Sequence, residues 1–219
     1  MMRESKGNMY GFVNFTWNIC KGVCPHGCTY CFMRQFKQNP LRFDEKELKT
    51  DLGAGNFIFV GSSCDMWADA VDGDWIKKIL NHCAKYPKNK YLFQTKNPKR
   101  FDKFKDLIPK ESVLGTTIET NRRYPQMGQA PDVKDRAFFI GQLSKDFETC
   151  ITLEPIMDFD LDDFVRLIRE AGPDWVNIGA DSKNHNLPEP SKEKILALVE
   201  KLKGFTEIKK KSNLGRLLK

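Results

Sequence analysis

No run of apolar residues in this chain is long enough to cross a membrane, and the first residues, MMRESKGNMYGF, lack the apolar stretch of a secretory signal. No long segment rich in glycine, serine or proline marks a linker between domains. The cysteines number seven, and an odd count crowded toward one motif does not suit a disulfide framework. These absences predict one domain with no membrane-spanning segment, and we expect it in a reducing compartment, the cytoplasm.

Acidic residues are scarce at the C-terminal end, where most of the net charge of +7 resides. Between Lys201 and Lys219, seven lysines and arginines stand against a single acidic residue, Glu207. We therefore expect residues 1–203 to form the folded domain and residues 204–219 to form a basic tail. The simpler interpretation of the tail is a solvated, frayed end, and the alternative is a contact to nucleic acid phosphates.

Segments rich in β-branched or aromatic residues alternate along the chain with helix-like segments. The predicted strands are residues 11–17, 56–61, 90–96, 112–119, 149–154 and 175–179. The predicted helices are residues 44–52, 74–85, 98–107, 130–143, 161–171 and 191–203. Alternation of this kind requires a parallel sheet with right-handed crossovers. Six units predict an α/β fold of the open, partial (β/α)6 TIM-like barrel type, since a closed eight-unit barrel needs about 250 residues. A doubly wound sheet is the alternative.

Cys24, Cys28 and Cys31 form a C-x-x-x-C-x-x-C motif in the loop predicted at residues 18–32, after the first strand. Clustered cysteines in a reducing compartment usually bind metal. Three thiolates suit a 4Fe-4S cluster in which one iron lacks a protein ligand and stays open. Cys20 could instead complete a closed four-cysteine zinc or iron–sulfur site. The residues alone leave open both metal sites, and also unrelated free thiols.

Polar and small residues follow the predicted strands at their carboxyl ends, where the reacting groups of such barrels lie. A buried Glu at a strand end is costly unless it is paired, so these acids are better site candidates than scattered surface acids. Each candidate also has a purely structural interpretation. The serines could cap a helix, and Lys96 could be surface charge. Glu119 and Glu154 could form salt bridges to Lys96, and Cys64 could be a small buried residue. The candidates are Gly61, Ser62, Ser63, Cys64, Lys96, Thr117, Glu119 and Glu154.

The cysteine spacing resembles the signature of the radical S-adenosylmethionine (SAM) superfamily. The resemblance implies that Cys24, Cys28 and Cys31 hold a 4Fe-4S cluster whose open iron binds SAM. It further implies reductive cleavage of SAM to a 5′-deoxyadenosyl radical that abstracts hydrogen from a substrate. Tyr30, directly before the last cysteine, is placed by the resemblance near the SAM adenine, and Phe32 is assigned to the same cofactor-binding region.

The strand-end phrases resemble a small phage-associated radical-SAM-like family of unsettled function, and the Thr95-Lys96 ending is similar to one in the spore photoproduct lyase family. These resemblances assign Lys96 to the SAM carboxylate and Cys64 to hydrogen-atom donation. The phrase GSS stands where the superfamily commonly has a GGE-like stretch that binds the SAM amino group. The implied SAM-binding set is Tyr30, Phe32, Gly61, Ser62, Ser63, Lys96, Thr117, Glu119 and Glu154.

The resemblance implies an external reductant of the flavodoxin or ferredoxin type. It does not name a substrate. A nucleic acid base or a nucleotide is our first hypothesis, which the basic tail supports through its affinity for phosphates. The alternative substrate is a peptide or a small metabolite. A third hypothesis for the function is a non-catalytic module in which all four cysteines close the cluster.

Overall fold

The computed structural model describes residues 1–219 and centres on an eight-stranded sheet in the order β1-β2-β5-β6-β7-β8-β9-β10. All neighbours in this sheet are parallel except β1, which pairs with β2 antiparallel. The end strands pair on one side only, so the sheet does not close, and the predicted open partial barrel is confirmed. The strands are β1 (Arg3–Glu4), β2 (Phe15–Trp17), β5 (Phe57–Val60), β6 (Lys90–Thr95), β7 (Ser112–Thr117), β8 (Glu148–Leu153), β9 (Trp175–Ile178) and β10 (Glu207–Lys210).

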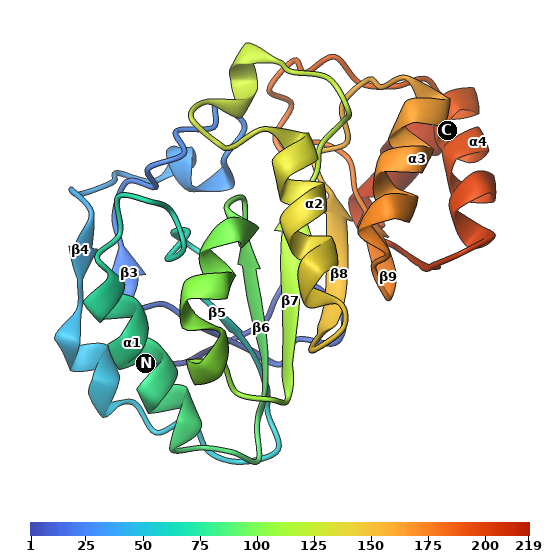
Figure 1. Ribbon diagram of the computed structural model, residues 1–219. Coiled ribbons are helices and arrows are strands. Elements are labelled where there is room, and N and C mark those ends of the chain that lie inside the picture. Colours follow the sequence, from blue (N-terminus) through green and yellow to red (C-terminus); the bar gives the residue numbers. More distant parts are fainter.

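The helices that connect the strands cover one face of the sheet (Figure 1). Several begin at a side chain that accepts a backbone hydrogen bond, such as Asp72, Asp132 and Ser191. The α-helices are α1 (Gly73–Ala84), α2 (Val133–Leu143), α3 (Leu161–Ala171) and α4 (Lys192–Lys203), and the 3-10 helices are η1 (Phe32–Gln35), η2 (Glu45–Lys49), η3 (Pro98–Leu107), η4 (Pro125–Met127) and η5 (Ser212–Leu218). The helices predicted at residues 44–52 and 98–107 are thus 3-10 helices. The sequence could not distinguish the two types, because periods of 3.0 and 3.6 residues cannot be separated over so short a segment.

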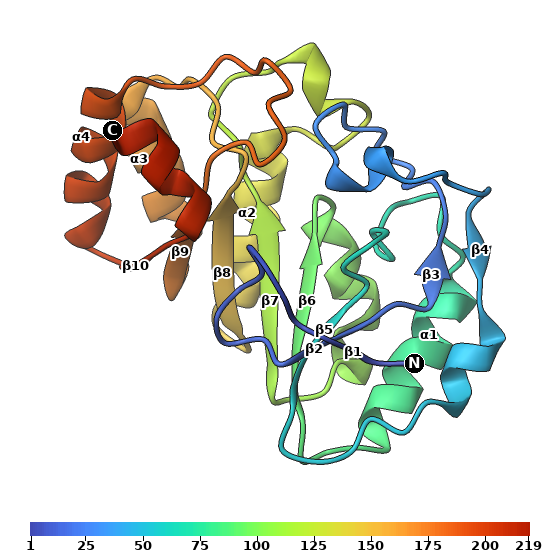
Figure 2. The same cartoon turned by 180° about the vertical axis from the view of Figure 1, so that it is seen from behind.

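The N-terminal segment crosses the opposite, inner face of the sheet (Figure 2). Tyr10 stacks on Phe12, whose ring meets the edge of Trp175 in β9. The Tyr10 hydroxyl donates to Gln94 Oε1 at 2.7 Å and lies 2.9 Å from Thr152 Oγ1. This packing explains why the first strand begins at Phe15 rather than at residue 11. It also covers part of the inner face of the sheet with aromatic side chains.

Residues 204–219 are folded rather than frayed, which corrects the expectation of a solvated tail. β10 adds a seventh parallel strand beside β9. Lys209 places its ammonium 3.8 Å from the ring centroid of Trp175, so a charged side chain covers an aromatic one at the sheet edge. This strand was not predicted from the sequence, because EIKK contains a single apolar residue.

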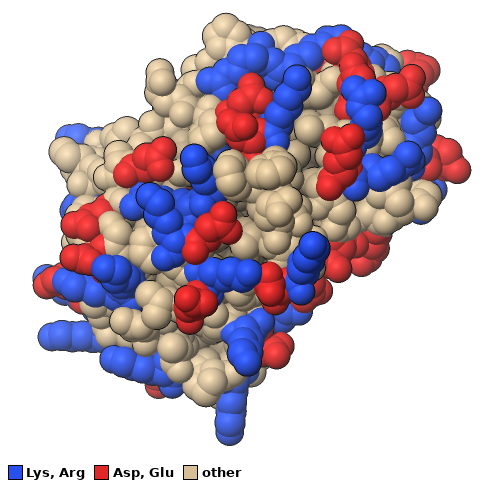
Figure 3. All heavy atoms as spheres, in the orientation of Figure 1, with Lys and Arg blue, Asp and Glu red and all other residues tan.

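The surface over the helices carries both signs of charge. Figure 3 shows lysines and arginines interspersed with aspartates and glutamates on this face. This face therefore presents no surface of one charge sign. No helix is long and apolar enough to span a membrane.

Candidate active site

A cavity of about 870 Å³ opens at the carboxyl ends of the strands. One wall is a hairpin whose arms are β3 (Cys20–Lys21) and β4 (Arg42–Phe43), and we call residues 20–43 the cysteine hairpin. In Figures 1 and 2 its arms β3 and β4 lie beside the sheet, and the segment between the arms lies at the end to which β6 and β7 point. The remaining walls come from the N-terminal segment, the end of β7, the loops after β5, β6, β8 and β9, and the C-terminal segment.

Three of the hairpin cysteines line this cavity and the fourth does not. Cys24, Cys28 and Cys31 contribute to its wall. Cys20 is 1% exposed within the β3–β4 pairing, away from the cavity, and burial raises the pKa of its thiol to about 12. Of the four cysteines of the hairpin, the three of the C-x-x-x-C-x-x-C motif are therefore the ones that line the cavity.

Cys64, on the loop after β5, is a further cysteine that lies next to the motif. The interaction between the Cys64 and Cys24 side chains lowers the pKa of the Cys24 thiol to about 6 and raises the pKa of the Cys64 thiol. Cys64 is buried but lines the cavity. The loop after β5 thus brings this sulfur beside the first cysteine of the motif, a contact that the sequence does not reveal.

The donor set fits an iron–sulfur cluster better than a single metal ion. The ligands of one zinc ion surround it at about 2.3 Å and must nearly touch one another. No three Cys, His, Asp or Glu side chains are gathered in that way. A cluster, in contrast, accepts its thiolates on separate iron atoms. Cys24, Cys28 and Cys31 line one cavity, so three cysteines are at hand there for a group with several iron atoms.

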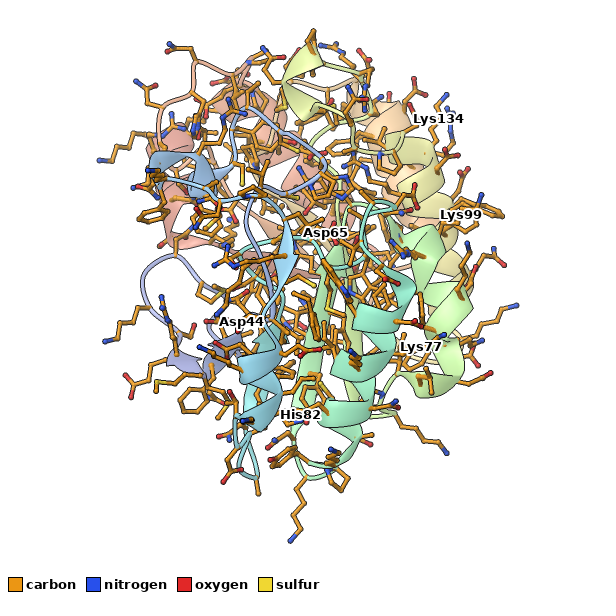
Figure 4. All side chains as sticks on the ribbon, turned by 90° about the vertical axis from the view of Figure 1, so that its left-hand side faces the viewer. Asp44, Asp65, Lys77, His82, Lys99 and Lys134 are labelled. Atoms are coloured by element: carbon orange, nitrogen blue, oxygen red, sulfur yellow. The ribbon has the colours of Figure 1, made fainter.

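Asp65 holds the cysteine hairpin against the sheet. Its largely buried carboxylate lies 2.7 Å from His26 Nε2 and accepts hydrogen bonds from Thr95 Oγ1 at 2.8 Å and from the Lys96 N–H at 2.9 Å. Burial alone would lower the pKa of His26, but the Asp65 carboxylate raises it. Figure 4 shows Asp65 inside the molecule and Lys77 at its outer edge. His26 was absent from the predicted site, although it lies inside the cysteine motif.

A second anchor of the hairpin is its contact with the segment at η4. The Gln129 N–H donates to the His26 carbonyl at 2.7 Å, and the Thr29 N–H donates to the Gln126 carbonyl at 2.9 Å. Gly128 makes this approach possible, since a Cβ there would lie 2.2 Å from the His26 carbonyl oxygen. Its φ of +63° also belongs to the region that favours glycine.

Gly128→Ala should therefore destabilise the protein by more than the roughly 1 kcal/mol of left-handed strain, because the backbone of the hairpin must also shift. Gly172→Ala is the matched control, because Gly172 has a φ of +56° with no atom closer than 4.0 Å to the added Cβ. Urea unfolding of both variants measures the difference. Equal losses would show that the hairpin does not press on Gly128.

Beneath the cysteine motif lies a buried group of charges centred on Glu119. Glu119 Oε1 accepts from Lys96 Nζ at 2.6 Å and Oε2 accepts from Arg136 Nη1 at 2.8 Å. The Tyr30 hydroxyl also donates to Glu119. Burial alone would raise the pKa of this carboxyl, but the two cations lower it to about 2. Lys96 additionally reaches Cys28 Sγ at 3.3 Å.

This placement changes the expectation for Glu119, which does not line the cavity. Its carboxylate is fully buried under Lys96, as in the salt-bridge alternative. Arg136, on α2, was not foreseen as its partner, because a lone Arg in an amphipathic helix gives no sign of full burial. The Glu119 side chain points toward α2 because its carboxylate accepts a hydrogen bond from Arg136 on that helix.

The other predicted residues are placed on the cavity wall. Ser62 exchanges hydrogen bonds with the Asn18 side chain, whose Oδ1 also accepts from the Ser63 N–H, so a local turn role accompanies any ligand role. Glu154 accepts from Asn8 at 2.6 Å, from Asn213 at 2.7 Å and from Lys211. The predicted residues on this wall are Tyr30, Phe32, Gly61, Ser62, Ser63, Cys64, Lys96, Thr117 and Glu154.

A histidine–aspartate pair lies on the loop after β9, and its histidine was not foreseen from the sequence. His185 Nδ1 is 2.6 Å from Asp181 Oδ1, and both residues line the cavity. Burial alone would raise the pKa of Asp181, but the hydrogen bonds from His185 lower it. The two neighbours of His185, Asn184 and Asn186, have positive φ angles of 54° and 53°. Two asparagines in this conformation are a signal of a tight loop that a sequence alone does not give.

The fold and site together define an α/β partial barrel with a cysteine-lined cavity at the carboxyl ends of its strands. Residues 9–192 match the model of a family described as "Protein of unknown function (DUF5131)", and the chain belongs to this family. No curated protein matches the chain.

Among solved structures the chain is similar to spore photoproduct lyase. A cysteine-to-serine variant of that enzyme has a TM-score of 0.68 at 12% identity, over 94% of this chain and 79% of that chain. A tyrosine-to-phenylalanine variant has a TM-score of 0.66 at 11% identity, over 92% and 78%. A double variant with bound AdoMet and dinucleoside spore photoproduct has a TM-score of 0.59 at 10% identity, over 91% and 64%. At these identities the likeness establishes the fold.

Proposed function

We propose that this protein is a radical SAM enzyme. Cys24, Cys28 and Cys31 would hold a 4Fe-4S cluster with one open iron, and SAM would bind that iron and supply the radical chemistry. The observation that carries the proposal is that these three cysteines, without Cys20, line one cavity in a fold similar to that of spore photoproduct lyase. The required electron would come from an external carrier of the flavodoxin or ferredoxin type.

The chain's own residues would bind and orient SAM. Tyr30, Phe32, Gly61, Ser62, Ser63, Thr117 and Glu154 would line its site, with Lys96 at the carboxylate and Glu119 acting through Lys96. Cys64 is our candidate hydrogen-atom donor.

The test of this proposal is SAM cleavage by the reconstituted protein under dithionite. Equal amounts of methionine and 5′-deoxyadenosine should form, and a variant with all three motif cysteines replaced by alanine should form neither. A wild-type protein that retains its cluster and binds SAM but yields no 5′-deoxyadenosine would contradict it.

Lys96→Ala should weaken SAM binding by about 1.5 to 3 kcal/mol, because a charged hydrogen bond to the carboxylate is lost. Lys90→Ala is the matched control, since Lys90 pairs with Glu148 at the opposite end of the sheet. Isothermal titration of the oxidised holoproteins gives both affinities. An unchanged affinity of Lys96→Ala would remove Lys96 from the SAM site.

For the substrate we propose a nucleic acid. The cavity lining holds six lysines and arginines against three acids, and each acid is bonded to a cation or a histidine. Arg34 and Lys183 also lie on this lining, and neither forms a salt bridge. Phe32, 47% exposed at the mouth, offers a ring on which an unpaired base could stack.

Arg34→Gln and Lys183→Gln should each weaken binding of a single-stranded thymidine oligonucleotide. Each should also lower the slope of log affinity against log salt by about 0.7, the value for one lost phosphate contact. Lys134→Gln is the control, because Lys134 lies on the outer helical side (Figure 4). Fluorescence anisotropy at several salt concentrations measures these slopes, and equal effects of all three changes would refute a specific role of the cavity mouth.

A further inference from the structure

Lys96 brings a positive charge to the sulfur of Cys28. Its Nζ lies 3.3 Å from Cys28 Sγ, 2.6 Å from the Tyr30 hydroxyl oxygen and 4.4 Å from the centre of the Tyr30 ring. The side chain is only 15% exposed. A buried ammonium group is therefore fixed at the middle cysteine of the motif by several contacts at once.

Glu119 determines where this ammonium sits. One carboxylate oxygen accepts from Lys96 and the other accepts from Arg136, and neither Glu119 nor Arg136 is exposed to solvent. Arg136 also donates to the Thr117 carbonyl at 2.9 Å, which ties the group to the end of β7. The carboxylate thus holds Lys96 against Cys28 and offsets part of its charge.

Charges in such a position act on the redox state of an iron–sulfur cluster. Net charge, hydrogen bonds to the sulfurs and solvent exposure set the reduction potentials of these clusters. A nearby positive charge stabilises the state that carries one more electron, and it does so more strongly in a buried site than in water. A nearby carboxylate has the opposite effect.

We propose that Lys96 and Glu119 set the reduction potential of the cluster, with Lys96 raising it through Cys28 and Glu119 lowering it. This inference rests on the proposed function, since it requires a cluster on the three cysteines, and it adds to the SAM contact proposed for Lys96. The redox step is the transfer of one electron: a low-potential carrier of the flavodoxin or ferredoxin type is oxidised and the cluster is reduced. No bond to Lys96 forms or breaks.

The experiment is a potentiometric titration of the reconstituted holoprotein with dithionite and mediators, followed by electron paramagnetic resonance. SAM is left out, so the SAM contact of Lys96 does not contribute. Lys96→Met should lower the midpoint potential and Glu119→Gln should raise it. Each change should alter the ratio of reduced to oxidised cluster at a fixed potential at least about tenfold, which is 59 mV for one electron. Lys96→Arg should restore most of the effect.

The surface pair provides matched controls, because Lys90→Met and Glu148→Gln remove the same charges at the opposite end of the strands and should leave the potential unchanged. Intact clusters with unmoved potentials in Lys96→Met and Glu119→Gln, or with shifts of the same sign, would overturn the inference. A loosening of the site that is common to both variants would shift both potentials in the same direction. If Glu119→Gln loses its cluster, the midpoint potentials of Lys96→Met and Lys96→Arg still test the role of the Lys96 charge. A wild-type protein without iron would overturn the proposed function itself and is recognised before any titration.

Discussion

Replacing Cys24, Cys28 or Cys31 singly by alanine should abolish iron retention, whereas Cys20→Ala should leave it unchanged. The reason is position: the first three sulfurs line the cavity, and Cys20 is enclosed in the β3–β4 pairing. Iron and sulfide per chain after anaerobic reconstitution and desalting measure the effect. Cys64→Ala serves as a second control, since Cys64 touches Cys24 but lies outside the motif.

Two results would contradict this account of the ligands. Loss of the cluster in Cys20→Ala, as complete as in the other three, would support the closed four-cysteine module. Loss in Cys64→Ala would instead assign a fourth ligand to the loop after β5. In either case no iron would stay open for SAM.

Glu119→Leu should destabilise the fold by about 3 to 5 kcal/mol, because it leaves Lys96 and Arg136 buried without a counter-charge. Glu148→Leu is the matched control: its partner Lys90 is solvent-exposed, and such pairs contribute about 0 to 1 kcal/mol. Urea unfolding of the two variants compares them directly.

The contribution of Glu119 should also depend on pH in a defined direction. Its folded pKa of about 2 lies below the value of about 4.3 for an unfolded chain. The stabilisation is therefore fully present above roughly pH 4.3 and is lost as the pH falls toward 2. The gap in stability between wild type and Glu119→Leu should narrow over that window. A gap that stays constant, or a loss no larger than that of Glu148→Leu, would show that the buried charges are not coupled.

The six central strands could be predicted because each carries β-branched or aromatic residues between turn residues, and alternation with helices then fixes a parallel order. β10 could not be predicted in this way. Its sequence EIKK is mostly charged, and it forms an edge strand because Lys209 lies across Trp175. The N-terminal segment was also misjudged, since its aromatic residues pack on the inner face of the sheet instead of extending the first strand.

The site was predictable to the extent that topology fixes it. Carboxyl ends of parallel strands meet at one rim, and Ser62, Lys96 and Thr117 do line one cavity there. Side-chain direction was not predictable, because it depends on partners far along the chain. Arg136 binds the Glu119 carboxylate outside the cavity lining. Asp65 binds His26 because the fold of the hairpin brings the two side chains together.

The most direct test of the central claim is the paramagnetic resonance spectrum of the reduced, reconstituted protein before and after addition of SAM. An open iron predicts that SAM changes the spectrum, because its amino and carboxylate groups become ligands of the cluster. The same change should be absent when a SAM analogue lacking these two groups, such as methylthioadenosine, is added. A spectrum that stays unchanged at saturating SAM would show a closed cluster and would contradict the account.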